Sequence, residues 1–380
     1  MKAIILAAGQ GTRVRPLTYE VPKPMVPILG KPVMEYLVEE LARHGVSEIM
    51  VNISHLPEQI ERYFGDGRRW GVNIGYSFEG HIQDGKIIAT PIGSAGGIKR
   101  IQDFSGFFDD TFVVVCGDAL IDLDITTAVR KHWQKGAAAS ICVHKVPRSR
   151  VSNYGVVVCE DDGRITSFQE KPSVQDARSN LVNTGIYIFE PEVLELVPSG
   201  RQYDIGSELF PEIVNRGLPF FAIHEPFNWV DIGRLSDYWE ANQQLMSGKL
   251  RDIKMPGKQV QPGVWTGLNC SVDWGEVHIE GPVYIGSSSR IEAGAEIIGP
   301  TWIGHGCHVK SGAVINRSIL FEYTRLGSAG YVEDSVVFGR YCVDKDGNAA
   351  HQGDMELDWV GDARVLESGE KVATIKTGSE

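Results

Sequence analysis

Residues 3–18 read AIILAAGQGTRVRPLT, an apolar run followed at once by a glycine-rich, cationic loop. Gly9 and Gly11 allow a tight turn in which backbone N–H groups can approach a ligand closely. Arg13 follows the turn directly, and Lys23 brings a second cation to the same segment. Because N–H groups and cations together bind phosphate oxygens, the loop is predicted to cradle a triphosphate.

Short apolar runs alternate with helical patterns around this stretch. Residues 112–116 (FVVVC) are continuously apolar, as in a buried parallel strand. Pro32 and Gly45 bracket a helical pattern over residues 32–44. The alternation predicts a mainly parallel sheet covered on both faces. Further strands are expected at 49–53, 137–143, 155–159 and 185–189, and a further helix from Pro57 to just before Gly65.

A six-residue period replaces this pattern in the last third of the chain. It fits neither an isolated helix nor an isolated hairpin, but it fits a parallel β-helix in which three hexads make one coil. The apolar positions are Ile279, Ile285, Ile291, Ile297, Ile303, Val309, Ile315 and Phe321, and after a slip of one residue Leu326, Val332 and Phe338.

Four segments are therefore expected along the chain. They are an α/β domain over residues 1–245, a polar linker over 246–258, a β-helix over 259–345 and an acidic tail over 346–380.

Composition excludes several partners. The chain has 380 residues, with 37 Lys and Arg against 49 Asp and Glu, a net charge of −12. Nucleic-acid and anionic-membrane binders are usually basic, so neither partner is expected. No stretch approaches the ~18 apolar residues that a membrane span needs. The six cysteines form no Cys-x-x-Cys pair, which favours free thiols and a cytoplasmic location.

Acidic residues follow apolar runs at two places. In an open α/β sheet, ligands bind beyond the carboxyl ends of the strands. Asp118 stands at that point after residues 112–116, and Asp231 stands between apolar residues and Gly233. Mg²⁺ prefers one or two carboxylates with waters and phosphate oxygens, so these acids are predicted to bind Mg²⁺ beside the phosphate loop.

Two other kinds of phosphate site are disfavoured. The chain has no Gly-Lys-Ser/Thr element, and therefore no P-loop. An NAD-dependent oxidoreductase would need a third glycine where Val14 stands, and Pro16 would disturb its pyrophosphate-binding helix. A non-catalytic subunit of the same fold stays open as an alternative, although it would be expected to lose a cation or a metal carboxylate.

The whole constellation resembles the sugar-1-phosphate nucleotidyltransferases, or NDP-sugar pyrophosphorylases. Their signature G-x-G-T-R-x-x-P-L-T, with K-P downstream, is carried by residues 9–18 and by Lys23-Pro24. The resemblance covers about residues 1–240, and the hexads extend it to about 345. It implies a Rossmann-like, mainly parallel α/β nucleotidyltransferase domain followed by a left-handed parallel β-helix of hexapeptide repeats.

The resemblance also implies roles for individual residues. Catalysis would rest on Arg13 and Lys23, which hold the triphosphate and departing pyrophosphate, and on Asp118, which holds Mg²⁺ with Asp231. The nucleotide would be bound by Ala8, Gly9, Gly11, Thr12, Arg13, Lys23, Gly93, Ser94, Ala95 and Gly96. The sugar phosphate would be bound by Gly155, Glu170, Lys171 and Asn183.

Within the family, the chain resembles cyanobacterial-type UDP-glucose pyrophosphorylases, a group similar to mannose-1-phosphate guanylyltransferases. The resemblance implies UTP and glucose 1-phosphate as substrates, with GTP and mannose 1-phosphate as the alternative. An extra stretch over residues 80–90, with a hairpin turn expected at Asp84-Gly85, lies beside the implied base pocket. A homo-oligomer formed through the β-helix is expected, because its flat aliphatic faces favour packing.

Overall fold

The computed structural model describes residues 1–249, 254–328, 330–339, 341–348, 360–362 and 364. The chain divides into two compact units. The first comprises Met1–Gly11, Val21–Val26 and Pro32–Asp231, and the second Thr12–Glu20, Pro27–Lys31 and Ile232–Glu380. The domain boundaries expected from the sequence stay a prediction.

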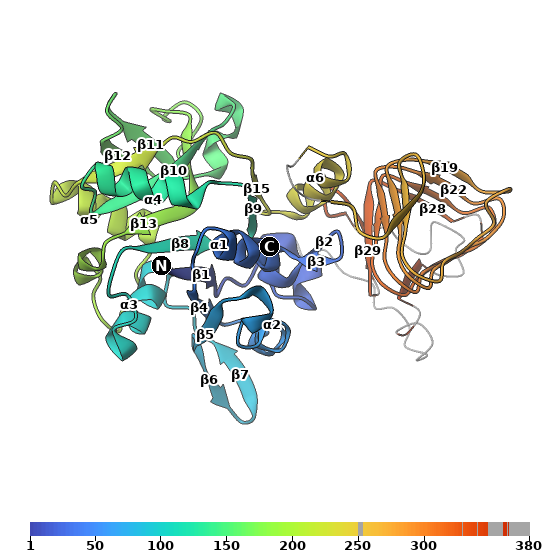
Figure 1. Cartoon of the computed structure of the whole chain (residues 1–380), viewed down its shortest axis with the longest axis horizontal. Coiled ribbons are helices and arrows are strands. Elements are labelled where there is room, and N and C mark those ends of the chain that lie inside the picture. The colour runs from blue at the N-terminus through green and yellow to red at the C-terminus, as the bar shows by residue number, and fades with distance from the viewer. Residues whose placement is uncertain (250–253, 329, 340, 349–359, 363, 365–380) are drawn as a thin grey trace. The chain divides into compact units, whose positions relative to one another are not determined.

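A mixed sheet forms the centre of the first unit (Figure 1). Its parallel part is β8 (Phe112–Cys116), β1 (Lys2–Ala7), β4 (Glu48–Ile53) and β5 (Asn73–Phe78), side by side in that order. On the other side of β8 the sheet turns antiparallel through β13 (Leu181–Phe189). It continues through β10 (Ala139–Lys145), β11 (Val156–Cys159), β12 (Ile165–Gln169) and β14 (Phe220–Ile223).

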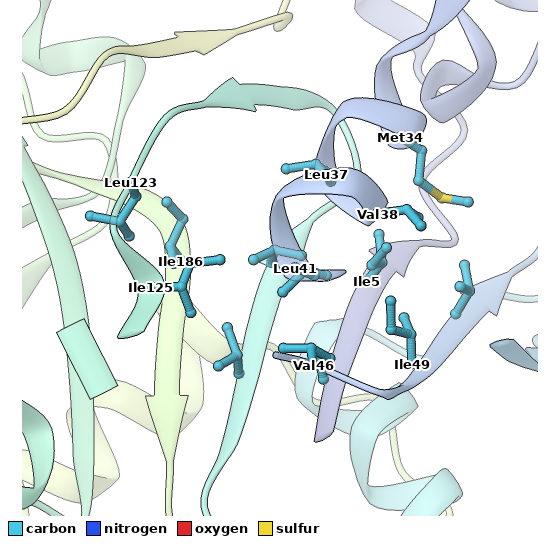
Figure 2. Packing of buried hydrophobic residues seen from close by; sticks show 14 of the residues in the cluster. Ile5, Met34, Leu37, Val38, Leu41, Val46, Ile49, Leu123, Ile125 and Ile186 are labelled. Carbon is cyan, nitrogen blue, oxygen red and sulfur yellow. The ribbon is translucent and has the colours of Figure 1, made fainter. Parts of the chain in front are cut away.

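Helices cover both faces of this sheet, as the alternating pattern predicts. Successive residues of β1 point to opposite faces, so Ile5 and Ile4 belong to different cores. Figure 2 shows Ile5 against α1, whose Leu37, Val38 and Leu41 come from one face of the helix. On the Ile5 face lie α1 (Val33–Arg43), α2 (Pro57–Phe64) and α4 (Ile125–Gln134); on the other lie α3 (Ser94–Ser105) and α5 (Phe210–Asn215).

Shorter elements complete the first unit. The extra stretch forms a hairpin of β6 (Gly80–Gln83) and β7 (Lys86–Ala89). Both Asp84 and Gly85 have positive φ, as the expected turn requires. Beyond β8, β9 (Ala119–Ile121) pairs antiparallel with β15 (Trp229–Asp231). Short helical segments of one or two turns lie at Lys23–Met25, Arg68–Trp70, Arg148–Asn153, Pro191–Leu196 and Ile205–Leu209.

A parallel β-helix forms most of the second unit, which confirms the interpretation of the hexads. Val283 pairs with Thr301, 18 residues later, so three hexads make one coil. Val314 pairs with Tyr331, 17 residues later, where the sequence period slips. The apolar hexad positions form a buried core, Ile285, Ile297 and Ile303 among them. The left-handed sense stays a prediction.

Three sheets make the faces of the β-helix. One holds β16 (Lys258–Gln261), β17 (Val264–Thr266), β20 (Val283–Ile285), β23 (Thr301–Ile303), β26 (Ile319–Leu320), β29 (Ser335–Phe338) and β30 (Tyr341–Asp344). The second holds β18 (Ser271–Val272), β21 (Arg290–Ile291), β24 (His308–Val309), β27 (Thr324–Leu326) and β31 (Val360–Asp362). The third holds β19 (His278–Glu280), β22 (Glu296–Ile298), β25 (Val314–Asn316) and β28 (Tyr331–Glu333). β31 falls within the expected tail.

Early segments of the chain also pack within the second unit. These are the short helices Thr12–Val14 and Leu17–Tyr19, and the strand β2 (Pro27–Ile28), which pairs with β3 (Lys31–Pro32). The hydroxyl of Tyr238, on α6 (Leu235–Met246), donates to the carbonyl of Pro27 at 2.8 Å. A Cβ on Gly339 would lie 2.9 Å from the Glu20 carboxylate, so that carboxylate rests directly on the last coil. In the described part of the chain, no helix has the length and apolarity to traverse a membrane.

Candidate active site

The end of β1 leads into open space. Ala8, the residue after this central strand, is buried, whereas Gly9 is exposed. A Cβ built on Gly9 would meet no atom within 4 Å, so a ligand could approach the backbone here without displacing the protein. Gly11 has a φ of +63°, a backbone conformation that residues other than glycine adopt only at a cost in free energy. The turn is therefore open to a ligand, and its role as a nucleotide loop stays a prediction.

A cation and an acid meet beyond the neighbouring strand. The ammonium of Lys23 donates to the carboxylate Oδ2 of Asp118, and only 11% of the lysine side chain is exposed. Gly117 brings Asp118 close to β1, because its N–H donates to the Leu6 carbonyl at 2.9 Å. A Cβ on Gly117 would lie only 3.1 Å from that carbonyl oxygen. The structure thus joins two residues that lie far apart in the sequence.

Asp231 reaches the same place through strand pairing. In the β9–β15 pair it lies opposite Ala119, the residue after Asp118. Burial raises the pKa of the neighbouring Cys116 thiol well above its usual range, and the charges of Asp118 and Asp231 raise it further. The strand pairing thus brings the backbone of Asp231 next to the residue that follows Asp118, the other acid predicted to bind metal.

These two carboxylates fit Mg²⁺ as a donor set. Among the residues that the structure describes, no group of three or more His, Cys, Asp or Glu side chains could hold a metal alone. Mg²⁺ does not need such a group, because it usually takes one or two carboxylates and fills its other positions with waters and phosphate oxygens. Asp118 and Asp231 would therefore hold the ion in concert with a triphosphate.

The segment predicted to hold the nucleobase begins α3. Gly93 has a φ of +82°, and a Cβ there would lie 2.5 Å from the Tyr203 carbonyl oxygen. The N–H groups of Ala95 and Gly96 both donate to that carbonyl, at 3.0 and 2.9 Å. The Ser94 hydroxyl donates to Asp204 Oδ2 at 2.8 Å. Because the N–H groups of Ala95 and Gly96 are engaged within the protein, these two residues would contribute shape to a base pocket rather than free N–H groups.

Two of the residues predicted to bind sugar phosphate lie beside a glycine. A Cβ on Gly155 would lie 3.2 Å from Glu170 Oε2 and 2.3 Å from the Phe168 ring, so only glycine fits. The Lys171 ammonium pairs with Glu170 at 2.9 Å, and both side chains are exposed. An exposed ammonium beside an acid is available to exchange its partner for a phosphate.

Asn183 reaches the same region with its amide already bonded. Its Oδ1 accepts from the Gly185 N–H at 2.9 Å, and its Nδ2 donates to the Tyr187 hydroxyl at 3.0 Å. Burial raises the pKa of Tyr187 well above its usual range, and the charges of Cys116, Asp204 and Glu170 add to the shift. Asn183 is therefore held by bonds within the protein, beside a buried Tyr187 hydroxyl.

Thr12 and Arg13 belong to the second unit. Both lie in the exposed part of the short helix Thr12–Val14, and Arg15 stacks on the Tyr19 ring at 5.0 Å. Their predicted contact with the triphosphate stays a prediction, as does every role assigned to a single residue.

Comparisons with known proteins assign the family. Residues 2–248 match the family model described as nucleotidyl transferase. The chain belongs to this family. A UTP–glucose-1-phosphate uridylyltransferase from Synechocystis sp. is 57% identical over 365 residues, which cover 96% of this chain and 94% of the relative. A mannose-1-phosphate guanylyltransferase from Mycobacterium tuberculosis is 30% identical over 296 residues, covering 78% and 77%.

A solved structure agrees with this assignment. It is a Bacillus anthracis protein named as a glucose-1-phosphate thymidylyltransferase, in complex with a sucrose. It is 26% identical and covers 68% of this chain and 98% of its own, with a TM-score of 0.56. The predicted family, the fold class and the nucleotidyltransferase class are thereby confirmed. The alternative, an NAD-dependent oxidoreductase, is wrong.

Sequence reasoning missed the residues that support the site of this nucleotidyl transferase. Asp122 accepts from the backbone N–H of Asn228 at 2.5 Å and from its side-chain amide at 2.6 Å, which fixes β15 and hence Asp231. Asp204 accepts from Ser94 and caps the turn at Gly206. The bonds of Asp122 to Asn228 and of Asp204 to Ser94 could not be predicted, because these partners lie about a hundred residues away in the sequence.

Proposed function

We propose that the protein makes UDP-glucose and pyrophosphate from UTP and glucose 1-phosphate. The observation that carries the substrate pair is the 57% identity with the Synechocystis uridylyltransferase, which extends over 96% of the chain. The geometry supports the reaction class, because an open glycine turn lies at the end of the strand beside a lysine and two acids.

The reaction is a displacement at phosphorus. A phosphate oxygen of glucose 1-phosphate attacks the α-phosphorus of UTP and forms a new P–O bond. The bond from the α-phosphorus to the bridging oxygen breaks, and its electron pair leaves with pyrophosphate. Because one phosphate anhydride replaces another, the reaction needs little acid–base chemistry and runs in both directions. Positioning and charge neutralisation carry most of the rate.

The chain's own residues supply those two effects. Lys23 gives up part of its pairing with Asp118 to neutralise triphosphate oxygens, and Arg13 adds a second cation. Asp118 and Asp231 would hold Mg²⁺, which supplies further neutralisation of phosphate charge when it is bound. Lys171 takes the phosphate of the sugar, and Glu170 and Asn183 take sugar hydroxyls.

An initial-rate matrix tests the proposal. Pyrophosphate release is measured with UTP, GTP, ATP and TTP, each against glucose 1-phosphate and mannose 1-phosphate, with Mg²⁺ present. The expected result is the highest kcat/KM for UTP with glucose 1-phosphate, and formation of UTP from UDP-glucose and pyrophosphate in reverse. No pyrophosphate from any pair would refute the reaction.

The second candidate is GTP with mannose 1-phosphate. It is favoured by the guanylyltransferase relative that is 30% identical over 78% of this chain. The same matrix decides between the two, because this alternative predicts the highest kcat/KM for GTP with mannose 1-phosphate.

Location and assembly extend the proposal. All six cysteines are free thiols, which supports a cytoplasmic enzyme. Exposed apolar side chains on the β-helix, Leu268, Trp274 and Tyr331, support a homo-oligomer through that domain. Light scattering of the full chain tests the oligomer: a monomeric mass would refute it. Neither nucleic acid nor a membrane is a proposed partner.

A further inference from the structure

A buried polar pair lies between the two segments that the proposed function assigns to the nucleotide. Asn52 belongs to β4 and is 2% exposed, and Glu79 follows β5 and is 1% exposed. Neither belongs to the predicted site. Burying a carboxylate is costly unless every oxygen finds a donor, so the pair needs an explanation.

Asn52 connects this pair to the nucleotide loop. Its Oδ1 accepts from the N–H of Ala7 at 2.7 Å, at the last residue of β1. Its Nδ2 donates to Glu79 Oε1 at 2.8 Å. The amide orientation is fixed at both ends, because Ala7 can only donate and the carboxylate can only accept.

Glu79 connects the pair to the start of α3. Its Oε2 accepts from the N–H of Ile92 at 3.0 Å, one residue before Gly93. Its backbone carbonyl accepts from the Ser54 hydroxyl at 2.6 Å and from Thr90 N–H at 3.0 Å. These bonds close the base of the β6–β7 hairpin, so the inserted hairpin and α3 both begin from one fixed residue.

The helix leaves space for this pair at one glycine. A Cβ on Gly97 would lie 2.3 Å from Glu79 Oε1 and 2.8 Å from Asn52 Nδ2. Both distances are shorter than real Cβ contacts. α3 therefore lies directly on the pair, with no room for another side chain.

We propose that Asn52 and Glu79 are positioning residues that hold the Ala8–Gly9 turn and the Gly93 segment at the spacing a bound nucleotide requires. The chain of bonds runs from Ala7 through the two side chains to Ile92. This role rests on the proposed function, since it takes both segments to be nucleotide-binding.

The pattern of donors makes the role testable with nearly isosteric substitutions. In Glu79→Gln, the amide oxygen must face the Ile92 N–H, so the NH₂ group faces Asn52. Asn52 must then turn its own oxygen toward Gln, which leaves its NH₂ group against the Ala7 N–H. Whichever way the two amides turn, two N–H donors face each other at one point between Ala7 and Ile92. A buried donor without an acceptor costs free energy.

Exchanging the two groups restores every bond. In Asn52→Asp alone, two buried carboxylates repel each other across the pair. In the double variant Asn52→Asp/Glu79→Gln, the new carboxylate accepts from Ala7 and from the Gln NH₂ group, while the Gln oxygen accepts from Ile92. Charge, size and bond number are then the same as in the native pair.

The experiment measures KM for UTP and for glucose 1-phosphate in the full-length wild type, in Glu79→Gln, in Asn52→Asp and in the double variant. Each single substitution is expected to raise KM for UTP about tenfold, the effect of about 1.4 kcal/mol, while KM for glucose 1-phosphate changes less than about twofold. The double variant is expected to return to within about threefold of wild type. Ser54→Ala, a milder variant that loses one bond to Glu79, is expected to fold and to raise KM for UTP about threefold.

A matched control separates positioning from stability. Ser140→Ala removes an equally buried hydrogen bond, 2.8 Å long, to His132. It is expected to lower Tm without changing KM for UTP. The proposal is overturned if the single variants and Ser54→Ala lower Tm but leave KM for UTP unchanged, or if the double variant is as impaired as the singles. A wild-type protein that releases no pyrophosphate would instead refute the proposed function, and with it the basis of this role.

Discussion

Gly9 provides a direct test of the nucleotide loop. An added Cβ would meet no protein atom within 4 Å, and the φ of Gly9 is not in the left-handed region. Gly9→Ala should therefore keep Tm within about 2 °C of wild type. The same methyl group would occupy the space through which a triphosphate reaches the backbone, so binding should suffer where folding does not.

The magnitude follows from one lost contact. A methyl group displaces the ligand by more than a hydrogen bond tolerates, and losing a buried hydrogen bond costs about 1–3 kcal/mol. KM for UTP should rise by a factor of about 5 to 150 at 25 °C. Initial rates of pyrophosphate release at varied UTP, beside a thermal melt, measure both quantities.

A second glycine serves as the control. Gly275 also has open space around its Cβ and lacks a left-handed φ, but it lies in the β-helix. Gly275→Ala should change neither Tm nor KM. If Gly9→Ala binds UTP as wild type does, no nucleotide approaches the backbone at this turn, and the predicted loop is wrong.

Two further predictions concern charge. Asp118→Asn should reduce kcat by a factor on the order of 10²–10³ with Mg²⁺ saturating. The control Asp161→Asn, which changes an exposed acid in a turn, should leave kcat unchanged. If the two variants have equal kcat, Asp118 does not belong to the site. Burial lowers the pKa of His132 despite its bond to Glu190, so the folded chain resists a proton that the unfolded chain takes up near pH 6.5. Stability should therefore fall as pH drops below about 6.5, and His132→Gln should flatten that part of a Tm-against-pH curve.

The elements that sequence reasoning found are those with a local signature. The apolar run Phe112–Cys116 is the strand β8, and the period of six is the β-helix, because each depends only on neighbouring residues. The order and direction of the strands were harder to predict from the sequence. The strands at residues 139–145 and 181–189 pair antiparallel, although the alternation favoured parallel neighbours. Nothing within either strand states which partner it will meet.

The same limit applies to the site. Lys23 and Asp118 could be singled out because each stands in a recognisable segment. Glu79 could not, because its burial depends on Asn52, 27 residues earlier, and on a helix that follows an inserted hairpin. Gly96 is predicted from the sequence to contact the nucleotide, whereas the next residue, Gly97, has no predicted role, and the structure shows why a glycine stands there: the Glu79 carboxylate leaves no room for a Cβ.

The packing of Thr12–Glu20 and Pro27–Lys31 within the β-helix unit bears on how this protein can be dissected. A recombinant fragment that stops at residue 245 would strip the coil from Glu20 and the Trp302 ring from Gly30, where a Cβ would approach that ring to 3.1 Å. Truncation would thus undo the scaffold of the arginine-bearing segment. An exchange of the repeat domain between enzymes would therefore require matching substitutions in Thr12–Glu20 and Pro27–Lys31.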